Sequence, residues 1–235
     1  MTPYREQAVL PELAGRLACV WSVRHDAPAQ VKPIVPDACI DLIWSSYDGS
    51  VHVAGPDSAP FMAALRPGEE FAGVRFRPGA AAEVLGVPAG TIRDRRVWLR
   101  ELWGRDADRI AEMVATAADR PRALEALVAR RAVEAGPRDR TATGVVRRLR
   151  AGGPIRTLAA DLGYSERQLL RRCNDAFGYG PKTLQRILRF QRALHLIGTG
   201  VALAKVAAEA GYADHAHLAR EMRQLAGVPP SALAA

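Results

Sequence analysis

The heptapeptide LAADLGY at residues 158–164 recurs as VAAEAGY at residues 206–212, 48 positions further along the chain. Both copies follow one pattern of apolar residue, two alanines, acid, apolar residue, glycine and tyrosine. One additional residue in the second copy changes the offset to 49, after which Arg171 aligns with Arg220. A repeat of this kind indicates one supersecondary unit that the chain uses twice.

Each copy is expected to fold as a helix, a tight turn and a second helix. Gly163 suits the positive φ at which a short helix ends, and Ser165 is a good N-cap with Gln168 as its capping-box partner. Asp214 takes the N-cap position in the second copy. Ala159, four residues before the glycine, is small enough to let the second helix cross closely. These features predict a helix-turn-helix unit in each copy.

Residues 181–197, which lie between the two copies, are expected to form one continuous helix. Pro181 stands at its first turn, apolar residues recur at helical spacing, and glycines follow at 198 and 200. At about 1.5 Å per residue the helix is roughly 25 Å long. The second helices of the two units lie beyond its ends, so their separation approaches the ~34 Å of one duplex turn. Two recognition helices of one chain are therefore expected to enter successive major grooves.

The segment 155–233 closely resembles the double helix-turn-helix domain of AraC/XylS-type transcription regulators. The resemblance rests on GYSERQLLRRCNDAFGYGP at 163–181 and GYADHAHLAREMRQLAGVPP at 211–230, with the spacer, glycines and final prolines in order. Cys173, Leu218 and Met222 stand at positions where aromatic residues are usual. These are apolar exchanges at core positions. The resemblance implies a sequence-specific DNA-binding transcription regulator whose activity the N-terminal domain modulates.

In the first recognition helix, Arg167, Leu170 and Arg171 are predicted to contact DNA. Their i, i+3, i+4 spacing places them on one face, away from the apolar stripe of Leu169 and Cys173. Two arginines on such a face suit guanine edges or phosphates.

In the second recognition helix, the resemblance assigns base contact to His215, Ala216 and Arg220, and Arg223 is expected on the same face. Ala216 has no hydrogen-bonding side-chain atom, so contact with a thymine methyl is its available form of base recognition. His217 is two positions from His215, so the two histidines point to different faces and do not predict a metal site.

The remaining basic residues of this region are expected to bind phosphates or acidic side chains within the domain. They are Arg172, Lys182, Arg186, Arg189 and Arg192.

The net charge of +8 is confined to the C-terminal part of the chain. Residues 1–137 contain 17 basic and 18 acidic residues, whereas residues 138–235 contain 16 basic and 7 acidic residues. Such asymmetry favours a polyanionic partner, here double-stranded DNA. Gly136 and Pro137 interrupt a helical pattern within a polar stretch. We therefore expect a regulatory, sensing or dimerisation domain at 1–137 and a DNA-binding domain at 138–235, with helix-turn-helix units at about 155–178 and 203–227.

The N-terminal half is predicted to be an α+β domain, with a small β-rich sheet or barrel and accompanying helices. The expected strands are 17–23, 39–45, 51–54 and 71–77, and the expected helices are 80–85, 106–118 and 122–135. We interpret the last two helices as an arm that leads to the all-α DNA-binding domain. The sequences at 35–44 and 71–79 also resemble the regulatory domain of a subset of AraC-type proteins, over about residues 10–105.

Six side chains near the predicted strands are candidates for a ligand pocket: Asp37, Asp41, Trp44, His52, Arg75 and Arg77. Each also has a structural alternative. An aspartate after proline forms turns, tryptophans are usually core residues, and an arginine can pair with a carboxylate across strands. Cys39, Asp41 and His52 do not form a recognisable catalytic motif, and free cysteines are common in cores.

The sequence indicates no cofactor, no metal site and no enzymatic activity. Three scattered cysteines argue against a disulfide framework, and no basic start followed by an apolar stretch indicates a signal peptide. Apolar runs are too short to span a membrane. We expect a cytoplasmic protein that associates with the nucleoid, with DNA, RNA polymerase, a small-molecule effector and a second copy of the chain as candidate partners. The alternatives are a non-specific architectural DNA-binding protein and a small-molecule enzyme fused to a DNA-binding domain.

Overall fold

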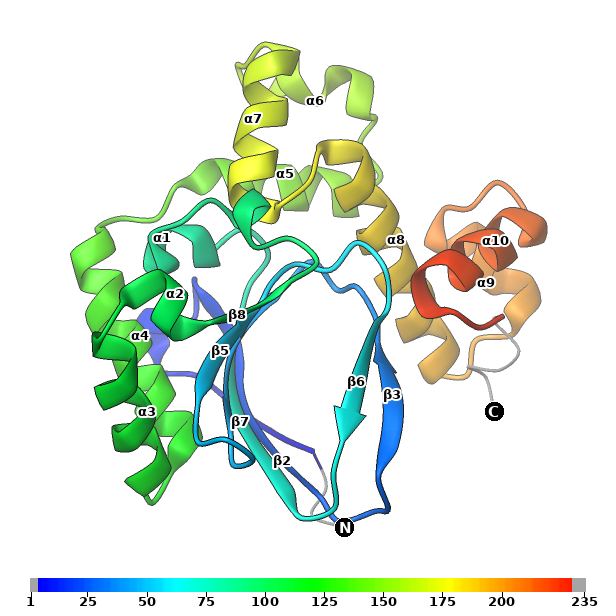
Figure 1. The fold of residues 1–235 in the computed structure, drawn as a ribbon. Coiled ribbons are helices and arrows are strands. Elements are labelled where there is room, and N and C mark those ends of the chain that lie inside the picture. Colours follow the sequence, from blue (N-terminus) through cyan, green and yellow to red (C-terminus); the bar gives the residue numbers. More distant parts are fainter. Residues whose placement is uncertain (1–3, 230–235) are drawn as a thin grey trace.

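The computed structural model describes residues 4–229, which form a β-rich domain followed by a helical region (Figure 1). The strands are β1 (Arg5–Gln7), β2 (Leu17–His25), β3 (Gln30–Ile34), β4 (Ile40–Ser45), β5 (Val51–Ala54), β6 (Phe61–Leu65), β7 (Glu69–Phe76) and β8 (Arg96–Trp98). The helices packed with them are α1 (Ala81–Leu85), α2 (Leu99–Trp103), α3 (Asp106–Thr116) and α4 (Arg120–Ala135). Short 3-10 helices occur at Pro11–Leu13 and Ala89–Thr91.

Six strands form one antiparallel sheet in the order β1-β2-β7-β4-β5-β8. Because successive residues of a strand point to opposite faces, the sheet has two chemically distinct sides. The side chains of one face, among them Leu42, Val53 and Val74, are buried in the core. The opposite face carries polar and aromatic side chains, including Asp41 and Arg75. The alternation within β4 and β7 thus separates an apolar core from a second face that carries polar and aromatic side chains.

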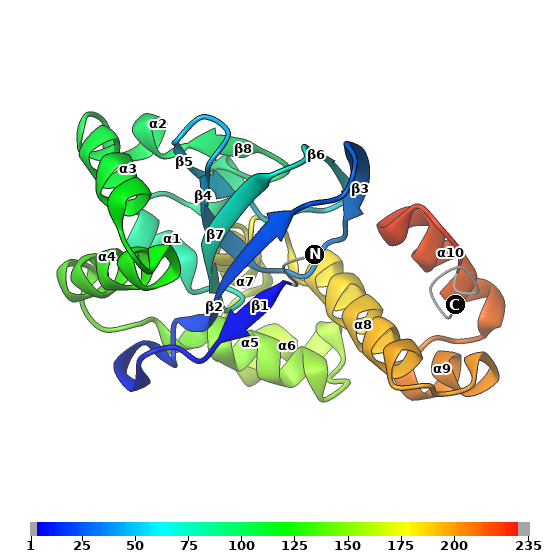
Figure 2. The same ribbon diagram turned by 90° about the horizontal axis from the view of Figure 1, so that it is seen from below.

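Helices α3 and α4 lie against the apolar face of the sheet (Figure 2). Leu124, Leu127 and Val128 of α4 are at most 4% exposed within the core that the helices share with β2, β4 and β7. The expectation that residues 106–135 form an arm to the DNA-binding domain was therefore wrong. Their amphipathic pattern serves to cover the sheet.

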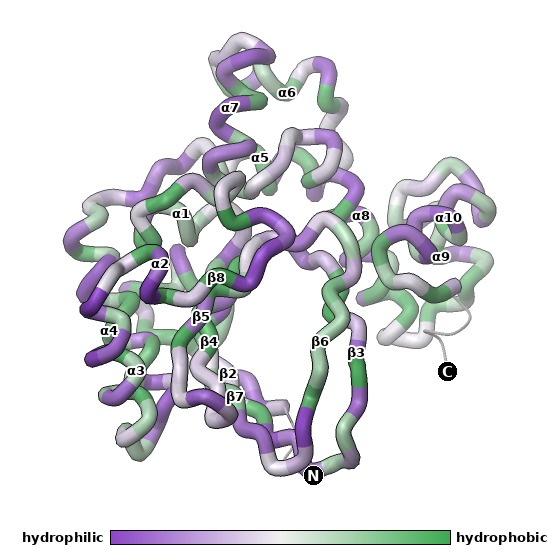
Figure 3. Tube along the Cα trace, viewed as in Figure 1, coloured by the Kyte–Doolittle hydropathy of each residue, from purple (hydrophilic) through white to green (hydrophobic). Residues whose placement is uncertain are grey.

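A separate two-stranded ribbon of β3 and β6 stands opposite the other face of the sheet (Figure 1). β6 is apolar throughout and appears green in Figure 3. Lys32, Ile34 and Phe61 line a cavity between the ribbon and the sheet. Val31 and Met62, on the outer side, are 61% and 57% exposed.

The C-terminal region consists of α5 (Arg140–Arg150), α6 (Ile155–Asp161), α7 (Glu166–Phe177), α8 (Pro181–Gly198), α9 (Leu203–Ala210) and α10 (His215–Ala226). Leu184 and Ile187, in the first half of α8, belong to a core with α5, α6 and α7. Phe190 and Ala193, in its second half, belong to a core with α9 and α10. One continuous helix therefore holds two separately packed units.

The predicted elements are confirmed within a few residues, among them β2, β4, β5, β7, α1, α3, α4 and α8. The elements that were not predicted from the sequence are β1, β3, β6, β8, α2 and α5. No helix within residues 4–229 is both long and apolar enough to cross a membrane. The division at residue 138 stays a prediction.

Candidate nucleic-acid interface and N-terminal cavity

The first helix-turn-helix unit is α6 and α7, joined by a turn in which Gly163 has φ +74°. Ser165 Oγ accepts a hydrogen bond from the Gln168 amide, and Gln168 Oε1 accepts one from the Ser165 amide. This reciprocal capping box confirms the predicted start of the helix. Its apolar side is buried, and the opposite side exposes Arg167, Leu170 and Arg171.

The second unit is α9 and α10, joined at Gly211 with φ +83°. Asp214 Oδ1 accepts a hydrogen bond from the His217 amide at 2.6 Å, as its predicted cap position requires. The His217 ring packs edge-on against Tyr212, with 5.1 Å between ring centroids. The four residues predicted to contact DNA here are exposed: His215, Ala216, Arg220 and Arg223.

The arginines of the helical region fall into two groups. Arg186 pairs with buried Glu221 at 3.0 Å, and Arg189 donates to the Gly211 carbonyl and lies over the Tyr212 ring. Arg172 pairs with Asp139 at 3.1 Å. These three arginines therefore hold the fold together, whereas Lys182 and Arg192 are exposed.

The arginines on the two exposed helix faces are different. The side chains of Arg167, Arg171, Arg220 and Arg223 have no hydrogen-bond or ion-pair partner within residues 4–229. Unpaired guanidinium groups on an exposed helix can form bidentate hydrogen bonds with guanine or phosphate.

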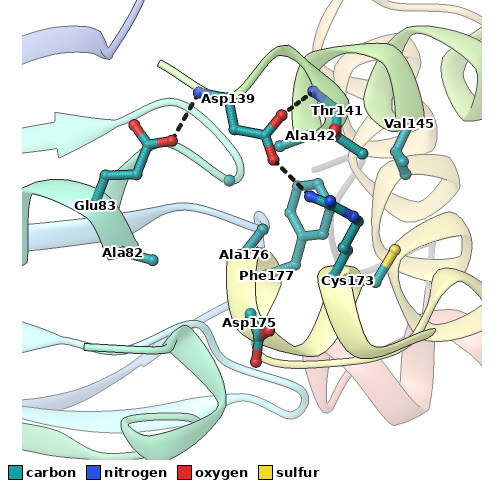
Figure 4. Close-up of a pocket in the computed structure, with 12 residues that line it drawn as sticks. Ala82, Glu83, Asp139, Thr141, Ala142, Val145, Cys173, Asp175, Ala176 and Phe177 are labelled. Atoms are coloured by element: carbon teal, nitrogen blue, oxygen red, sulfur yellow. Dashed lines mark hydrogen bonds and ion pairs between the residues drawn. The ribbon is translucent and has the colours of Figure 1, made fainter. Parts of the chain in front are cut away.

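The first recognition helix is docked on the N-terminal domain. Asp139 accepts a hydrogen bond from the Thr141 amide, and the Asp139 amide donates to Glu83 Oε1 at 2.7 Å (Figure 4). Glu83 in turn pairs with Arg16 at 2.7 Å. Because Asp139 also pairs with Arg172 of α7, a chain of charged contacts runs from the N-terminal domain to the recognition helix.

The end of α7 is packed even more closely against the N-terminal domain. Gly178 has φ +81°, and a Cβ there would lie 2.7 Å from Pro56 Cγ and 3.2 Å from the Ala89 carbonyl oxygen. The Gly178 carbonyl accepts a hydrogen bond from Arg93. Only glycine satisfies both the backbone conformation and the close approach.

A cavity of about 630 Å³ lies between the polar face of the sheet and the β3-β6 ribbon. The strand register places its side chains in rows across the sheet. Asp41 pairs with Arg75 and with Ala54, while Trp21 pairs with Gly73 and Gly73 with Ile43. A charged row and an aromatic row are therefore adjacent. His52, on β5, lies edge-on to Trp98, with centroids 6.3 Å apart.

The charged row is built around Arg75. Its Nε and Nη2 donate to both carboxylate oxygens of Asp41, at distances down to 2.9 Å. Burial raises the pKa of Asp41 to about 6, although the Arg75 charge opposes this change. Asp37 Oδ2 lies 3.7 Å from Arg75 Nε, and Asp37 Oδ1 accepts from the Cys39 amide. Burial followed by the charges of Asp37 and Asp41 raises the pKa of the Cys39 thiol.

Of the six predicted pocket residues, the structure brings Asp37, Asp41, His52 and Arg75 together in this cavity. Trp44 and Arg77 do not line it, so their inclusion was wrong. Trp44 lies on the opposite face of β4, where Arg120 covers its ring at 4.6 Å from the centroid. Arg77 follows β7 and donates to the Ala14 carbonyl.

Several other residues of the cavity were not predicted from the sequence. Tryptophans are usually core residues, and Trp21 is indeed only 6% exposed, yet it lines the cavity. Phe61 and the Arg96–Asp57 pair depend on the unpredicted strands β6 and β8. Alternation within β2 was the signal available for Trp21. It places Trp21 on the same face of the strand as Cys19 and Val23, which stand two residues before and after it.

Two helix-turn-helix units on one shared helix, carried beside a β-rich domain, define a DNA-binding protein of the regulator class. Residues 158–235 match the family model described as a helix-turn-helix domain. The helix-turn-helix domain predicted for this region is thereby confirmed. Residues 8–98 match a second model, described as a domain of unknown function (DUF6597). No curated protein matches the chain.

Among solved structures, ToxT from Vibrio cholerae has a similar fold. Its 1.65 Å structure gives a TM-score of 0.50 at 9% identity, covering 99% of this chain and 97% of that chain. ToxT bound to (E)-4-(8-methylnaphthalen-1-yl)but-3-enoic acid gives a TM-score of 0.48 at 9% identity, covering 99% and 98%. At this identity the likeness concerns the fold alone.

Proposed function

We propose that the protein regulates transcription by placing α7 and α10 in successive major grooves of one duplex. The observation that carries this proposal is the set of unpaired arginines on both exposed helix faces. In contrast, Arg172, Arg186 and Arg189 are engaged within the protein. At about 1.5 Å per residue, the 18 residues of α8 span roughly 27 Å between the two units.

Each unit has its own part in this mechanism. Arg167 and Arg171 contact guanine edges or phosphates from α7, and exposed Leu170 supplies an apolar contact beside them. On α10, Arg220, Arg223 and His215 provide donors, while Ala216 meets a thymine methyl. Lys182 and Arg192 contribute phosphate contacts that set the register of the protein on the duplex.

Selection of bound sequences from a random duplex pool tests this mechanism. We expect two half-sites about one helical turn apart, with Arg171→Ala and Arg220→Ala each costing about 1–3 kcal/mol on the selected duplex. Arg109→Ala, which removes one charge from the exposed side of α3, is the matched control. Unchanged affinity in both variants would contradict the assigned faces, and a pool without enrichment would favour an architectural DNA-binding protein.

The N-terminal cavity is the proposed site of a small-molecule effector that modulates DNA binding. The supporting observation is the segment between β3 and β4, which contacts the cavity and the helical region in turn. Asp37 and Cys39 line the cavity. Ala38 is buried in the core of the first helix-turn-helix unit, and the Pro36 carbonyl accepts a hydrogen bond from Gln191 of α8. A movement of this cavity wall is therefore transmitted to the first helix-turn-helix unit through Ala38 and to α8 through Pro36.

Tyr179 provides a second connection between the cavity and the helical region. It follows Gly178, the C-cap of α7, and is 2% exposed, and its hydroxyl has no hydrogen-bond partner within the described chain. Burial raises the pKa of Tyr179, and the negative charges of Asp37 and Asp57 add to this effect. The cavity carboxylates therefore act electrostatically on a residue at the junction of α7 and α8.

Filling the cavity distinguishes an effector site from a passive void. Ala63→Phe places a ring on the inner side of β6, whereas Met62→Phe adds a ring on the outer side. With a ligand found by thermal-shift screening of the full chain, we expect Ala63→Phe to lose the ligand's effect on DNA affinity and Met62→Phe to retain it. Retention in both variants would show that the effector acts elsewhere.

The protein is proposed to have no catalytic step. The raised pKa of Cys39 keeps its thiol protonated near neutral pH, and burial lowers the pKa of His52. A protonated thiol is a poor nucleophile. Self-association and contact with RNA polymerase on nucleoid DNA complete the proposed regulatory role, and sedimentation with and without operator DNA measures the first of these.

A further inference from the structure

The charged row of the cavity contains more carboxylates than cations. Three carboxylates surround Arg75: Asp41 at 2.9 Å, Asp37 at 3.7 Å and Glu6 at 3.9 Å. Arg96 is occupied by Asp57 through two hydrogen bonds of 2.8 Å. Both guanidinium groups of this row are therefore already neutralised by carboxylates.

The other basic groups of the cavity do not offset this excess of carboxylates over cations. Lys32 and Arg66 are exposed, and Arg66 lies over the Tyr47 ring at 3.8 Å from its centroid. Burial lowers the pKa of His52, so its imidazole is neutral at pH 7. The buried part of the cavity is consequently negative.

Aromatic rings flank this negative region. The Trp21 ring lies directly over Gly73, so that a Cβ added to Gly73 would come within 2.4 Å of it. The Tyr4 and Trp21 ring centroids are 5.8 Å apart. Trp98 lines the same cavity. Carboxylates beside indole and phenol rings form the environment that binds organic cations, because ring faces attract positive charge.

A second observation concerns the buried indole nitrogen of Trp21. Trp21 is 94% buried, yet its Nε1 has no hydrogen-bond partner within residues 4–229. Nε1 lies 2.8 Å from the position of a Cβ on Gly73, on the cavity face of the sheet. Trp21 and Arg75 are diagonal neighbours in the β2-β7 register, which corresponds to about 7–8 Å. A buried donor without a partner is unfavourable and therefore needs a functional or structural reason.

We propose that the cavity binds a protonated aromatic amine, with the ammonium group at Asp37 and Asp41 and the ring beside Trp21 and Trp98. This inference rests on the proposed effector function of the same cavity and names the chemical class of its ligand.

A ligand that carries a carboxylate in place of the ammonium group is disfavoured by the charges around Arg75. It would bring a fourth negative charge to the three carboxylates around Arg75, whose charge Asp41 already neutralises through both of its oxygens. An ammonium group is favoured, because it adds the positive charge that the row lacks.

Three probes with one skeleton test the proposal: 4-phenylbutylamine, 4-phenylbutanol and 4-phenylbutyrate. Binding to the full chain at pH 7.5 is followed by calorimetry. We expect the amine to bind about tenfold tighter than either other probe, the factor that one charge-assisted hydrogen bond supplies. Asp41→Asn and Asp37→Asn should each remove this preference, while Glu112→Gln on exposed α3 should preserve it. Unchanged circular dichroism and DNA binding without probe verify that each variant is folded.

The outcomes separate this proposal from the proposed function. Equal or tighter binding of the carboxylate overturns the amine proposal and leaves the effector site in place. An amine that binds in an Asp41-dependent manner without changing DNA affinity supports the ligand class and contradicts the effector function. Binding of none of the three probes, or binding that neither asparagine variant changes, contradicts the amine proposal.

Discussion

The two helix-turn-helix units have the same local design but different attachments. Both recognition helices begin at a side-chain cap and end at a glycine in the left-handed region, Gly178 and Gly227. α7 is packed on α1 and on the 3-10 helix at Ala89–Thr91, whereas α10 packs on α8 and α9. The N-terminal domain reaches the core of the second unit through Val35. The N-terminal domain therefore packs against one recognition helix itself, whereas α8 and α9 hold the other.

This difference suggests how regulation reaches DNA. A duplex is read when both helices fit successive grooves at once, so a small shift of the docked helix relative to α10 changes affinity without altering any base contact. The segment around Ala38 and the junction at Tyr179 connect that docking surface to the cavity. The comparison of the two units is thus open to direct tests, since the chain offers matched positions in each.

The equivalent glycines provide the test with the largest expected effect. A methyl group at either position suffers the left-handed backbone, which costs about 1–2 kcal/mol. Gly227 has open space around it, whereas a Cβ at Gly178 meets Pro56 and the Ala89 carbonyl, adding about 1–3 kcal/mol of overpacking. We expect Gly178→Ala to lower the free energy of unfolding by about 2–5 kcal/mol and Gly227→Ala by about 1–2 kcal/mol.

Urea denaturation followed by circular dichroism measures both variants. The chain can also respond to Gly178→Ala by separating the two surfaces rather than by unfolding. In that case hydrogen exchange of the amides at Ala89–Thr91 rises for Gly178→Ala and not for Gly227→Ala. Equal behaviour of the two variants in both measurements would mean that the first unit is not docked in solution.

The two N-caps provide a test in which the units should behave alike. Ser165→Ala and Asp214→Ala each remove the side-chain acceptor of a recognition helix, and each should cost about 1 kcal/mol. Hydrogen exchange at the first turns of α7 and α10 reports the loss where it occurs. A cost confined to one unit would show that capping and docking are not independent, which would weaken the comparison.

The helical region was predictable because its signals are local. The repeat, the capping residues and the glycines act within a few positions, and the confirmed start of α7 at Ser165 depends on them alone. The cavity depends on non-local pairing between β2, β7, β4 and β5, which a single sequence does not reveal. β3 contains Pro33, and β6 lacks polar alternation, so neither carries a strand signal.

One error was avoidable from the sequence. Asp41 and Trp44 are three residues apart in one strand, so alternation alone places them on opposite faces. The structure shows this separation, with Asp41 at the cavity and Trp44 in the core. Their joint inclusion in a single pocket was inconsistent with the strand that the same analysis predicted.

Asp139 provides the test with the smallest expected effect, because it probes the charged contact between the first unit and the N-terminal domain. Burial opposes ionisation of Asp139, but its hydrogen bonds with Thr141 and the charge of Arg172 lower its pKa below the ordinary value. A lowered pKa in the folded state stabilises the protein above the ordinary value of about 3.9. This stabilisation is lost as the pH falls through the pKa of the folded state.

Asp139→Asn should therefore cost less than about 1 kcal/mol at pH 7, as expected for an exposed ion pair, and the difference from the wild type should shrink as the pH falls below about 4. Urea midpoints at pH 7, 5 and 3.5 measure this convergence, with exposed Glu112→Gln as the control. Because Asp139 also accepts from the Thr141 amide at 2.8 Å, Arg172→Gln is needed to separate the two contributions. If Arg172→Gln leaves the acid dependence of the wild type intact, the pKa of Asp139 reflects the capping of α5 alone, and the docking of α7 rests on the apolar contact at Gly178.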